Sequence, residues 1–316
     1  MNPDLSVDYL GMKLRTPFVP SASPRSERVD NVERMADAGA AAVVLHSLYG
    51  EQCGAESCDG RLFRISPDLY CEHIREAKRR VSIPIIASLN VTNAGGWLDA
   101  AKQIEDAGAN ALELSIPRFP AVSYRSSDQI ERETVEWVYL LHQTIDIPIA
   151  VKLTPFYTNL FHLASQMQDA GARGLTLFNR FVQPDLSGPG NEEFACVPLS
   201  TVMDSRLPMH WIAVMAPRLQ MSLAASGGIQ RAEDAAHLLQ VGADVTMVCS
   251  VLLRRGVTYL AELEQALSSW MAQRGFTSIA QFRGTLGYSP WSEPADEERR
   301  TYIHTLTKSE HRLGAN

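Results

Sequence analysis

One lysine lies inside an apolar stretch of strand-forming residues. Residues 147–155 read IPIAVKLTP, and Lys152 comes just before the exit of this run. Burying an ammonium group without a partner costs several kcal/mol of stability. Only five of the 29 Lys and Arg residues are lysines, which argues that Lys152 is not simply one of many surface lysines. We therefore expect an anionic or electron-rich group opposite Lys152. The alternative is a strand-end lysine whose head group reaches solvent.

A second chemical signal lies in two turns near the end of the chain. SGGI at 226–229 follows one apolar run, and Cys249-Ser250 follows the next. Backbone amides in glycine turns and at helix starts attract anions, phosphate in particular. The two turns together predict a phosphate site. Alternatively, Gly227 and Gly228 only permit a tight turn.

The elements that must position these residues are marked by a recurring phrase. DAGAAAVVLHS, DAGANALELSI, DAGARGLTLFN and VGADVTMVCS begin at residues 37, 106, 169 and 241. Each reads as a helix end, a glycine that closes it in a left-handed cap, and a buried strand. The glycines at 39, 108, 171 and 242 are spaced by about two β-α units of 30 to 40 residues each. One more strand is therefore expected inside each gap.

The missing strands are present, which gives eight strands that alternate with helical segments. In order they read PFVPSAS, AAVVLHS, IPIIASLN, ALELSI, IPIAVKLT, GLTLFNR, MSLAASGG and VTMVCS. Continuous apolar strands are typical of a parallel sheet covered on both faces. Eight β-α units predict an α/β fold, a single (β/α)8 TIM barrel of about residues 16–275. We expect one domain over residues 1–316, with a C-terminal helical extension over about residues 276–316.

Polar residues gather at the carboxyl ends of these strands, where the active sites of such barrels lie. Insertions at 48–68, 117–128 and 181–207 follow the second, fourth and sixth strands. Long loops at this end of a barrel are often lids, so all three are predicted to cover the mouth.

Composition limits the classes of partner. A formal net charge of −7 and a pI near 5.6 argue against nucleic acid or an anionic membrane as a partner. No uninterrupted apolar run approaches 18 residues, so we expect no membrane span and a cytoplasmic location. The five cysteines do not suggest a disulfide framework. Cys53 and Cys58 form a weak metal motif without a second pair, so free thiols and no metal are predicted.

The mouth of the barrel is predicted to hold a planar phosphorylated cofactor. The signals for it are the phosphate site, the buried cation and the polar groups at Ser47, Asn90 and Asn179. Flavin mononucleotide (FMN) fits this pattern. Lys152 beneath the pyrimidine edge of the ring would stabilise the charge of reduced flavin. Asn179 could hydrogen-bond a substrate carbonyl or carboxylate, and Arg180 could bind a carboxylate or hold a lid.

In this order and spacing, the phrases TPFVPSAS, VKLTP, LFN, SGGIQRAEDA, MVCSVLLRRG and QFRGTLGY resemble the dihydroorotate dehydrogenase family over nearly the full length. The resemblance implies FMN, a (β/α)8 barrel, oxidation of a dihydropyrimidine carboxylate, and a homodimer. It places the flavin-contacting lysine at Lys152 and the substrate-contacting asparagine at Asn179. The candidate cofactor-binding residues are Ser21, Ala22, Ser47, Asn90, Ser115, Lys152, Asn179, Gly227, Gly228, Cys249 and Ser250.

The chain departs from this family on the substrate side. His46 stands where the family has lysine, the loop after the fourth strand has no clear counterpart of the family's catalytic Cys or Ser, and an Asn-rich segment is missing. General-base help in such an oxidation is worth about 10²- to 10⁴-fold. Ser123 or Tyr124 could serve as the base, or alternatively His46, whose ordinary pKa near 6.5 suits proton transfer. Lys152 and Asn179 are the other catalytic candidates.

Three functions are consistent with these residues. The first is an FMN-dependent oxidoreductase that acts on dihydroorotate or a related dihydropyrimidine or cyclic amide. The second is a phosphate-binding barrel lyase or synthase without flavin, in which Lys152 forms a Schiff base or holds a carboxylate. The third is a flavin-binding electron-transfer partner without its own dehydrogenase chemistry. A small-molecule substrate is expected, and an electron-acceptor protein is possible for the first and third.

Overall fold

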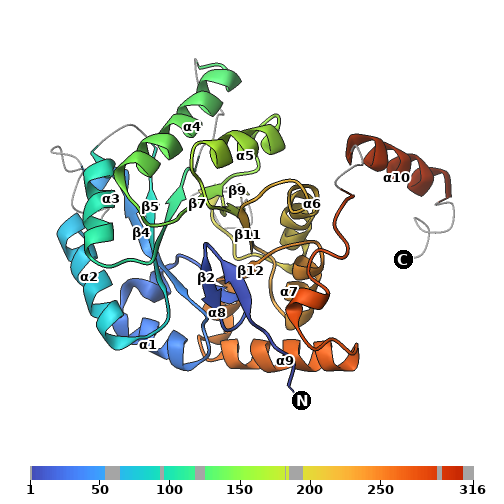
Figure 1. Ribbon diagram of the computed structural model, residues 1–316, viewed down its shortest axis with the longest axis horizontal. Helices are drawn as coiled ribbons and strands as arrows, with labels where there is room; N and C mark the ends of the chain where they lie inside the picture. The colour runs from blue at the N-terminus through green and yellow to red at the C-terminus, as the bar shows by residue number, and fades with distance from the viewer. Residues whose placement is uncertain are drawn as a thin grey trace, which may run out of the picture.

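Eight parallel strands form the barrel that the repeats predict (Figure 1). The structure, a computed structural model, describes residues 2–53, 65–92, 96–117, 125–181, 183–184, 195–289 and 294–308. The sheet order is β3-β12-β11-β8-β7-β6-β5-β4, and the Ala41 N–H donates to the Phe18 carbonyl at 3.0 Å to close the ring. The strands are β3 Phe18–Pro20, β4 Val43–Tyr49, β5 Ile85–Asn90, β6 Ala111–Ser115, β7 Ile149–Leu153, β8 Gly174–Leu177, β11 Ser222–Ser226 and β12 Val245–Val248.

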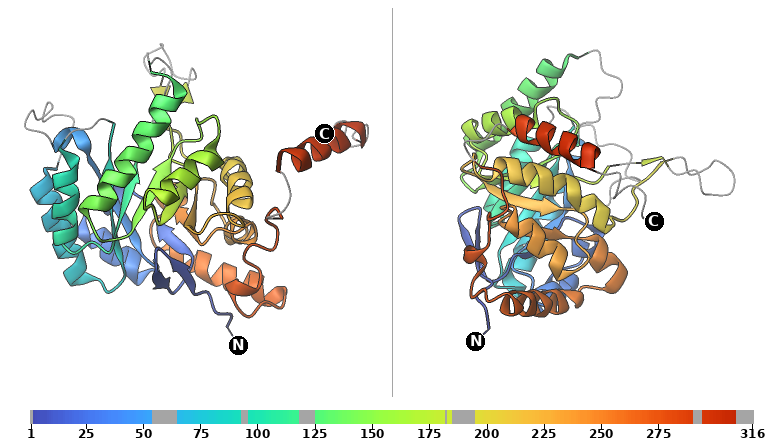
Figure 2. Two further views of the ribbon diagram at one scale, coloured as in Figure 1. Left: turned by 45° about the horizontal axis from the view of Figure 1, so that its top comes forward. Right: turned by 90° about the vertical axis from the view of Figure 1, so that its right-hand side faces the viewer.

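Helices surround this sheet on its outer side, as expected for β-α units (Figures 1 and 2). They are α1 Val29–Asp37, α2 Pro67–Arg80, α3 Trp97–Asp106, α4 Ser127–Thr144, α5 Leu160–Asp169, α6 Arg206–Met215, α7 Ala232–Gln240, α8 Ser250–Arg255 and α9 Tyr259–Gln273. Short 3-10 helices are η1 Pro24–Glu27, η2 Gly50–Gln52, η3 Val202–Ser205 and η4 Ile279–Gln281. In the part of the chain that the structure describes, no helix is both long enough and apolar enough to cross a membrane.

The glycine caps predicted from the repeated phrase are confirmed. Gly39, Gly108, Gly171 and Gly242 all have positive φ, between 94° and 118°. Only glycine adopts this backbone conformation without a steric cost, so each one ends a helix and turns the chain into the next strand.

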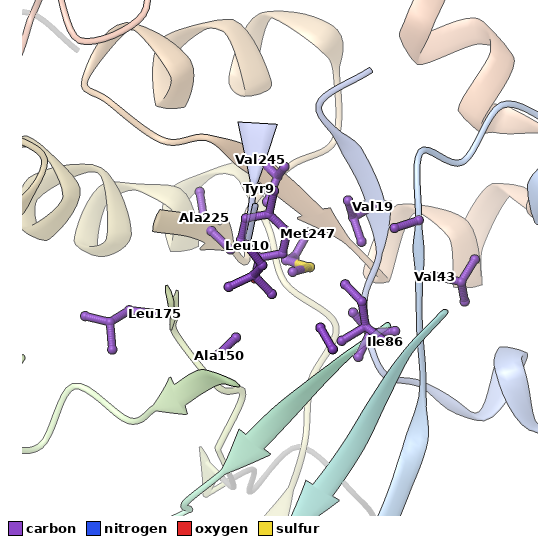
Figure 3. Packing of buried hydrophobic residues seen from close by; sticks show 14 of the residues in the cluster. Tyr9, Leu10, Val19, Val43, Ile86, Ala150, Leu175, Ala225, Val245 and Met247 are labelled. Atoms are coloured by element: carbon purple, nitrogen blue, oxygen red, sulfur yellow. The ribbon is translucent and has the colours of Figure 1, made fainter. Parts of the chain in front are cut away.

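The core explains why the strands read as continuous apolar runs. Every residue of β6, β7, β8 and β12 is buried, because one face packs inside the barrel and the other against helices. Figure 3 shows Val19, Ile86 and Met247 from different strands among the residues of this core.

A hairpin that the sequence analysis did not identify is part of this core. β1 Val7–Tyr9 pairs antiparallel with β2 Met12–Leu14, and the turn residues Leu10 and Gly11 both have positive φ. Ser222 Oγ accepts a 2.9 Å hydrogen bond from the Leu10 N–H, and a Cβ on Gly174 would lie 2.7 Å from the Leu10 side chain. The hairpin therefore packs against the amino-terminal ends of β8 and β11, and Figure 3 shows Tyr9 and Leu10 among core residues.

The chain after α9 has two different parts. Phe282 is fully buried, and Arg283 donates hydrogen bonds to the carbonyls of Gly242 and Ala243. In contrast, helix α10 Pro294–Lys308 extends to one side of the barrel (Figures 1 and 2) and exposes Tyr302, Ile303 and Leu306. A C-terminal helix is thus present, and residues 276–289 pack on the barrel.

The three predicted insertions lie partly outside the described residues. Residues 54–64 fall in the first, 118–124 in the second, and 182 and 185–194 in the third. In the third, β9 Gln183–Pro184 pairs antiparallel with β10 Ala195–Cys196, and the insertion ends in η3 and the start of α6.

Candidate active site

The partner expected opposite Lys152 is a carboxylate on the neighbouring strand. Lys152 on β7 and Glu113 on β6 are both buried, and Lys152 Nζ lies 3.2 Å from Glu113 Oε1. Lys152 Nζ also donates to Ser21 Oγ at 3.1 Å, and Thr176 Oγ1 donates to Glu113 Oε2 at 2.9 Å. Each charge thus has an opposite charge and a further hydrogen bond, which is what stabilises a buried ion pair.

A cavity of about 600 Å³ opens beside this ion pair at the carboxyl ends of the strands. Ligand pockets in proteins commonly have volumes of about 300 to 1,000 Å³. Eight of the candidate cofactor-binding residues line it: Ser21, Ala22, Lys152, Asn179, Gly227, Gly228, Cys249 and Ser250. Strands β3, β7, β8, β11 and β12 therefore converge on one site, as the barrel topology predicts.

The glycine turn after β11 forms a tight cradle in this cavity. Gly227 and Gly228 have φ of 100° and 80°. A Cβ at Gly228 would clash with the backbone nitrogen of Ser205 and lie 2.7 Å from its Cβ. The amides of Gln230 and Arg231, just before α7, already donate to Asp234 Oδ2 at 2.9 and 2.8 Å. An anion in this turn would thus depend on the amides around Gly227 and Gly228, and not on the start of α7.

The described end of the third insertion lies against the turn after β12 and the start of α8. Ser200 Oγ and Ser250 Oγ are 2.9 Å apart, and the Ser200 N–H donates to Ser250 Oγ at 2.9 Å. Arg254 Nη1 donates to the Ser200 carbonyl at 2.9 Å. Residues 197–200 also line the cavity, so this segment forms one wall of the site.

An ion pair fixes the other end of that wall. Arg180 Nη1 donates to Asp204 Oδ1 at 2.6 Å, and Arg180 Nε donates to the Pro198 carbonyl at 2.8 Å. Arg180 thus pairs with a carboxylate of the protein itself, and these contacts hold the loop. The adjacent Asn179 lines the cavity and donates to Ser115 Oγ at 3.4 Å.

Three candidate cofactor-binding residues lie on the strands of the opposite half of the barrel and do not line the cavity. Ser47 on β4 hydrogen-bonds Ser88 on β5 at 2.8 Å, while Asn90 ends β5 and pairs with Ser115 on β6. Of these three, only Ser115 connects to the cavity, through its hydrogen bond with Asn179. The loops that follow these strands contain residues outside the described part of the chain.

His46 is a residue of β4, and its side chain packs between this strand and helix α2. Its Nδ1 is 3.4 Å from the Ser26 carbonyl, its ring makes edge contacts with Tyr70 and His73 of α2, and its Nε2 has no hydrogen-bond partner among the described residues. Desolvation, followed by the nearby His73, lowers its pKa to about 4. His46 does not line the cavity. This placement argues against the proton-transfer role considered above.

The remaining candidates give no further base in the described residues. Ser123 and Tyr124 lie outside the described part of the chain. Cys249 is in the cavity wall, and burial raises its pKa, so its thiol stays protonated near neutral pH. No group of three or more His, Cys, Asp and Glu among the described residues could hold a metal, while Cys58 falls in the part not described.

Comparison with known proteins places this site in a family. The dihydroorotate dehydrogenase family model matches residues 67–271, from helix α2 to α9. The chain belongs to the dihydroorotate dehydrogenase family. Members of this family are oxidoreductases that act on CH–CH bonds, so this chain is an oxidoreductase of that family. The resemblance stated from the sequence is confirmed.

Three similar proteins have different names. The chain is 27% identical to a putative dihydroorotate dehydrogenase A (fumarate) of Aeropyrum pernix, with 89% of this chain and 97% of the relative covered. It is 24% identical to the catalytic subunit of a dihydroorotate dehydrogenase B (NAD⁺) of Methanothermobacter thermautotrophicus, with the same coverage. It is 23% identical to the NAD-dependent dihydropyrimidine dehydrogenase subunit PreA of Escherichia coli, with 95% of this chain and 80% of the relative covered.

Glu113 is the site residue that sequence reasoning did not assign. A signal for it existed, because Glu113 and Lys152 are the only Asp, Glu, Lys or Arg residues in the eight barrel strands, all of which the structure describes. In contrast, Ser200 lies in an irregular segment and Asp204 in the single turn η3, where no periodicity indicates which side chains turn inward.

Proposed function

We propose that this chain is an FMN-dependent dehydrogenase that oxidises dihydroorotate or a related dihydropyrimidine or cyclic amide by hydride transfer to the flavin. The observation that carries the proposal is a cavity of about 600 Å³ with the Lys152–Glu113 pair at one side and the Gly227-Gly228 cradle at another. The cation, the anion-binding turn and the volume between them fit a flavin with a single phosphate.

The residues present match the parts of FMN in a specific way. The amides around Gly227 and Gly228, with Ser250, would hold the phosphate. Lys152 would lie at the pyrimidine edge of the ring, where negative charge develops on reduction. Ser21 and Ala22 would contact the ring, and Asn179 would orient the substrate. When bound, FMN supplies the hydride acceptor, and the protein supplies position and electrostatics.

The base that removes the substrate proton stays a prediction. Ser123 and Tyr124 in the loop after β6 are the candidates, because that loop leaves the strand end next to Lys152. His46 is the weaker candidate, since it packs against α2.

Two related substrates must be compared. The names of some relatives contain dihydroorotate and those of others dihydropyrimidine. Dihydroorotate carries a carboxylate that a simple dihydropyrimidine such as dihydrouracil lacks. The names of two relatives describe subunits, which favours an electron-acceptor protein as a partner. A homodimer and a cytoplasmic location stay predictions.

The test starts from the visible spectrum of the purified protein, with FMN added if none is bound. Anaerobic dihydroorotate and dihydrouracil are then added separately. Bleaching of the flavin band at a catalytically useful rate by either compound supports the proposal and identifies the substrate. A flavin that neither compound reduces would favour an electron-transfer partner, and no uptake of FMN would favour the flavin-free lyase.

Two glycine variants test the cradle in the same assay. Gly228→Ala introduces a Cβ that clashes with Ser205, whereas Gly256→Ala, at a φ of 87°, meets no atom within 4 Å. Both variants place alanine at a positive φ, at a cost of about 1 to 3 kcal/mol, and Gly256, with φ 87° and ψ 165°, lies in a region that essentially only glycine adopts, so the control carries at least as much backbone strain. We expect Gly228→Ala to weaken FMN binding at least tenfold and Gly256→Ala to retain it. Equal FMN affinity in the two variants would contradict the phosphate assignment.

A further inference from the structure

Among the contacts of the described residues, the Lys152 ammonium group has one N–H left for a ligand. An ammonium group has three donors. One lies toward Glu113 Oε1 at 3.2 Å and one toward Ser21 Oγ at 3.1 Å. Lys152 and Ser21 both line the cavity, whereas Glu113 is fully buried. The carboxylate therefore holds the ammonium from behind while the third N–H remains available on the cavity side.

Glu113 is itself held from the opposite direction. Thr176 on β8 donates to its second oxygen, and both residues are fully buried. Below them lies Tyr9 of the N-terminal hairpin, whose pKa is raised by burial and then by the charge of Glu113. The hairpin and three neighbouring strands therefore enclose this carboxylate, and it cannot rotate away from Lys152 toward solvent.

The charge of Glu113 must act on any group that binds beside Lys152. Glu113 and Lys152 are the only Asp, Glu, Lys or Arg residues in the eight barrel strands, all of which the structure describes. In a buried site of low dielectric constant, charges a few ångströms apart are weakly screened. The carboxylate thus offsets part of the positive charge that the lysine presents to the cavity.

We propose that Glu113 is a positioning residue that fixes the Lys152 ammonium against the flavin and lowers the flavin reduction potential by offsetting its charge. This inference rests on the proposed function, because it requires FMN in the cavity. Reduced flavin carries negative charge near the pyrimidine edge, so a more positive neighbourhood favours reduction and a more negative one opposes it. Removing either member of the pair should therefore shift the potential, in opposite directions.

The test is the midpoint potential of bound FMN, with FMN affinity measured in parallel. In Glu113→Gln we expect a rise of about 30 mV or more, which corresponds to a tenfold shift toward reduced flavin in a two-electron couple. In Lys152→Met, which leaves the carboxylate alone, we expect the potential to fall. Thr246→Val is the matched control, because it removes a buried 3.1 Å hydrogen bond to the Pro17 carbonyl elsewhere in the barrel. That control should leave the potential unchanged.

Glu113→Asp covers the case in which Glu113→Gln does not fold. Aspartate keeps the negative charge, but its shorter side chain places the carboxylate farther from Lys152. The midpoint potential of the flavin should therefore rise by less than in Glu113→Gln. An unchanged or lowered potential in whichever Glu113 variant folds, with FMN bound, overturns this inference alone. Wild-type protein that takes up no FMN overturns the proposed function and this inference together.

Discussion

The His46 side chain is the clearest source of pH-dependent stability at the scale of single residues. It is 9% exposed, its Nε2 has no hydrogen-bond partner in the part of the chain that the structure describes, and desolvation lowers its pKa to about 4 from an ordinary value near 6.5. In the unfolded chain the imidazole takes up a proton near pH 6.5, but in the folded protein it does so only near pH 4. The neutral ring is thus favoured by the fold, and protonation favours unfolding.

We expect His46→Phe to flatten the pH dependence of the unfolding free energy. In the wild type, the contribution of His46 is complete above about pH 6.5 and is lost as the pH falls to about 4, a total of about 3 kcal/mol. Phenylalanine retains the edge contacts with Tyr70 and His73 but cannot be protonated. Urea denaturation at intervals from pH 4 to pH 7 measures the difference.

His304→Phe is the control, because His304 is exposed on helix α10 and should not alter the slope. His73 also has a lowered pKa and remains in both variants, so some slope will persist. If His46→Phe kept the full wild-type slope, the buried neutral imidazole would not be its source. Retained flavin reduction in the same variant would separate His46 from catalysis.

For single residues, the sequence predicted the type of chemical group in the site better than the contacts that each side chain makes. A lysine inside an apolar run required an anion nearby, and Glu113 supplies it. The eight cavity-lining residues followed from their places at strand ends. The direction of the His46 side chain, toward the helices and away from the cavity, did not, because β4 carries an irregularity between Val44 and Ser47 that breaks the simple alternation of facing residues.

At the scale of elements, the segment 197–205 is held against the site by the Arg180–Asp204 pair. Burial alone would raise the pKa of Asp204, but the Thr201 N–H and Arg180 outweigh this and hold it below the usual range. Asp204 Oδ2 accepts from the Thr201 N–H at 2.7 Å, and Oδ1 accepts from Arg180 at 2.6 Å. One carboxylate thus both caps η3 and ties it to the residue after Asn179.

We expect Asp204→Asn to loosen this segment and weaken FMN binding by about tenfold. The variant loses a charge-assisted hydrogen bond of about 1.5 to 3 kcal/mol, part of which the asparagine oxygen and solvent replace. Limited proteolysis between residues 197 and 205 should become faster than in the wild type. Glu262→Gln, which breaks the exposed pair with Arg255, is the control and should change neither measurement. Wild-type proteolysis rates in Asp204→Asn would show that the pair does not hold the segment.

The order of the elements was predictable because the repeated helix end, glycine and strand each leave a strong local signal. All eight barrel strands lie where the apolar runs predict them, with bounds shifted by no more than three residues. The N-terminal hairpin gave no comparable signal, since its strands have three residues each and its turn places Leu10 at a positive φ. Leucine is rarely found there, and the packing of Leu10 against Gly174 explains why it is tolerated.

For the whole molecule, the barrel places the proposed phosphate and ring ends of the cofactor on different strands. Gly227 and Ser250 follow β11 and β12, whereas Lys152 and Glu113 lie on β7 and β6. The stability of the closed sheet is therefore linked to the geometry of the site, because moving one strand changes the distance between the phosphate end and the ring end of the proposed cofactor site. The residues that close the barrel from below, Tyr9 and Leu10, thus support the site without reaching the cavity.

The chain after α9 should contribute to this stability in two unequal parts. Phe282 is fully buried beside Trp270 and Phe276, so Phe282→Ala should cost about 3 to 5 kcal/mol. Among the described contacts, α10 meets the barrel through the half-exposed His210–Glu298 pair, worth about 1 kcal/mol or less. Truncation after Ser289 should therefore lower the Tm by no more than about 4 °C, and Phe282→Ala by about 10 °C. Calorimetry on both variants measures this, and a larger loss on truncation would show that α10 belongs to the folded core.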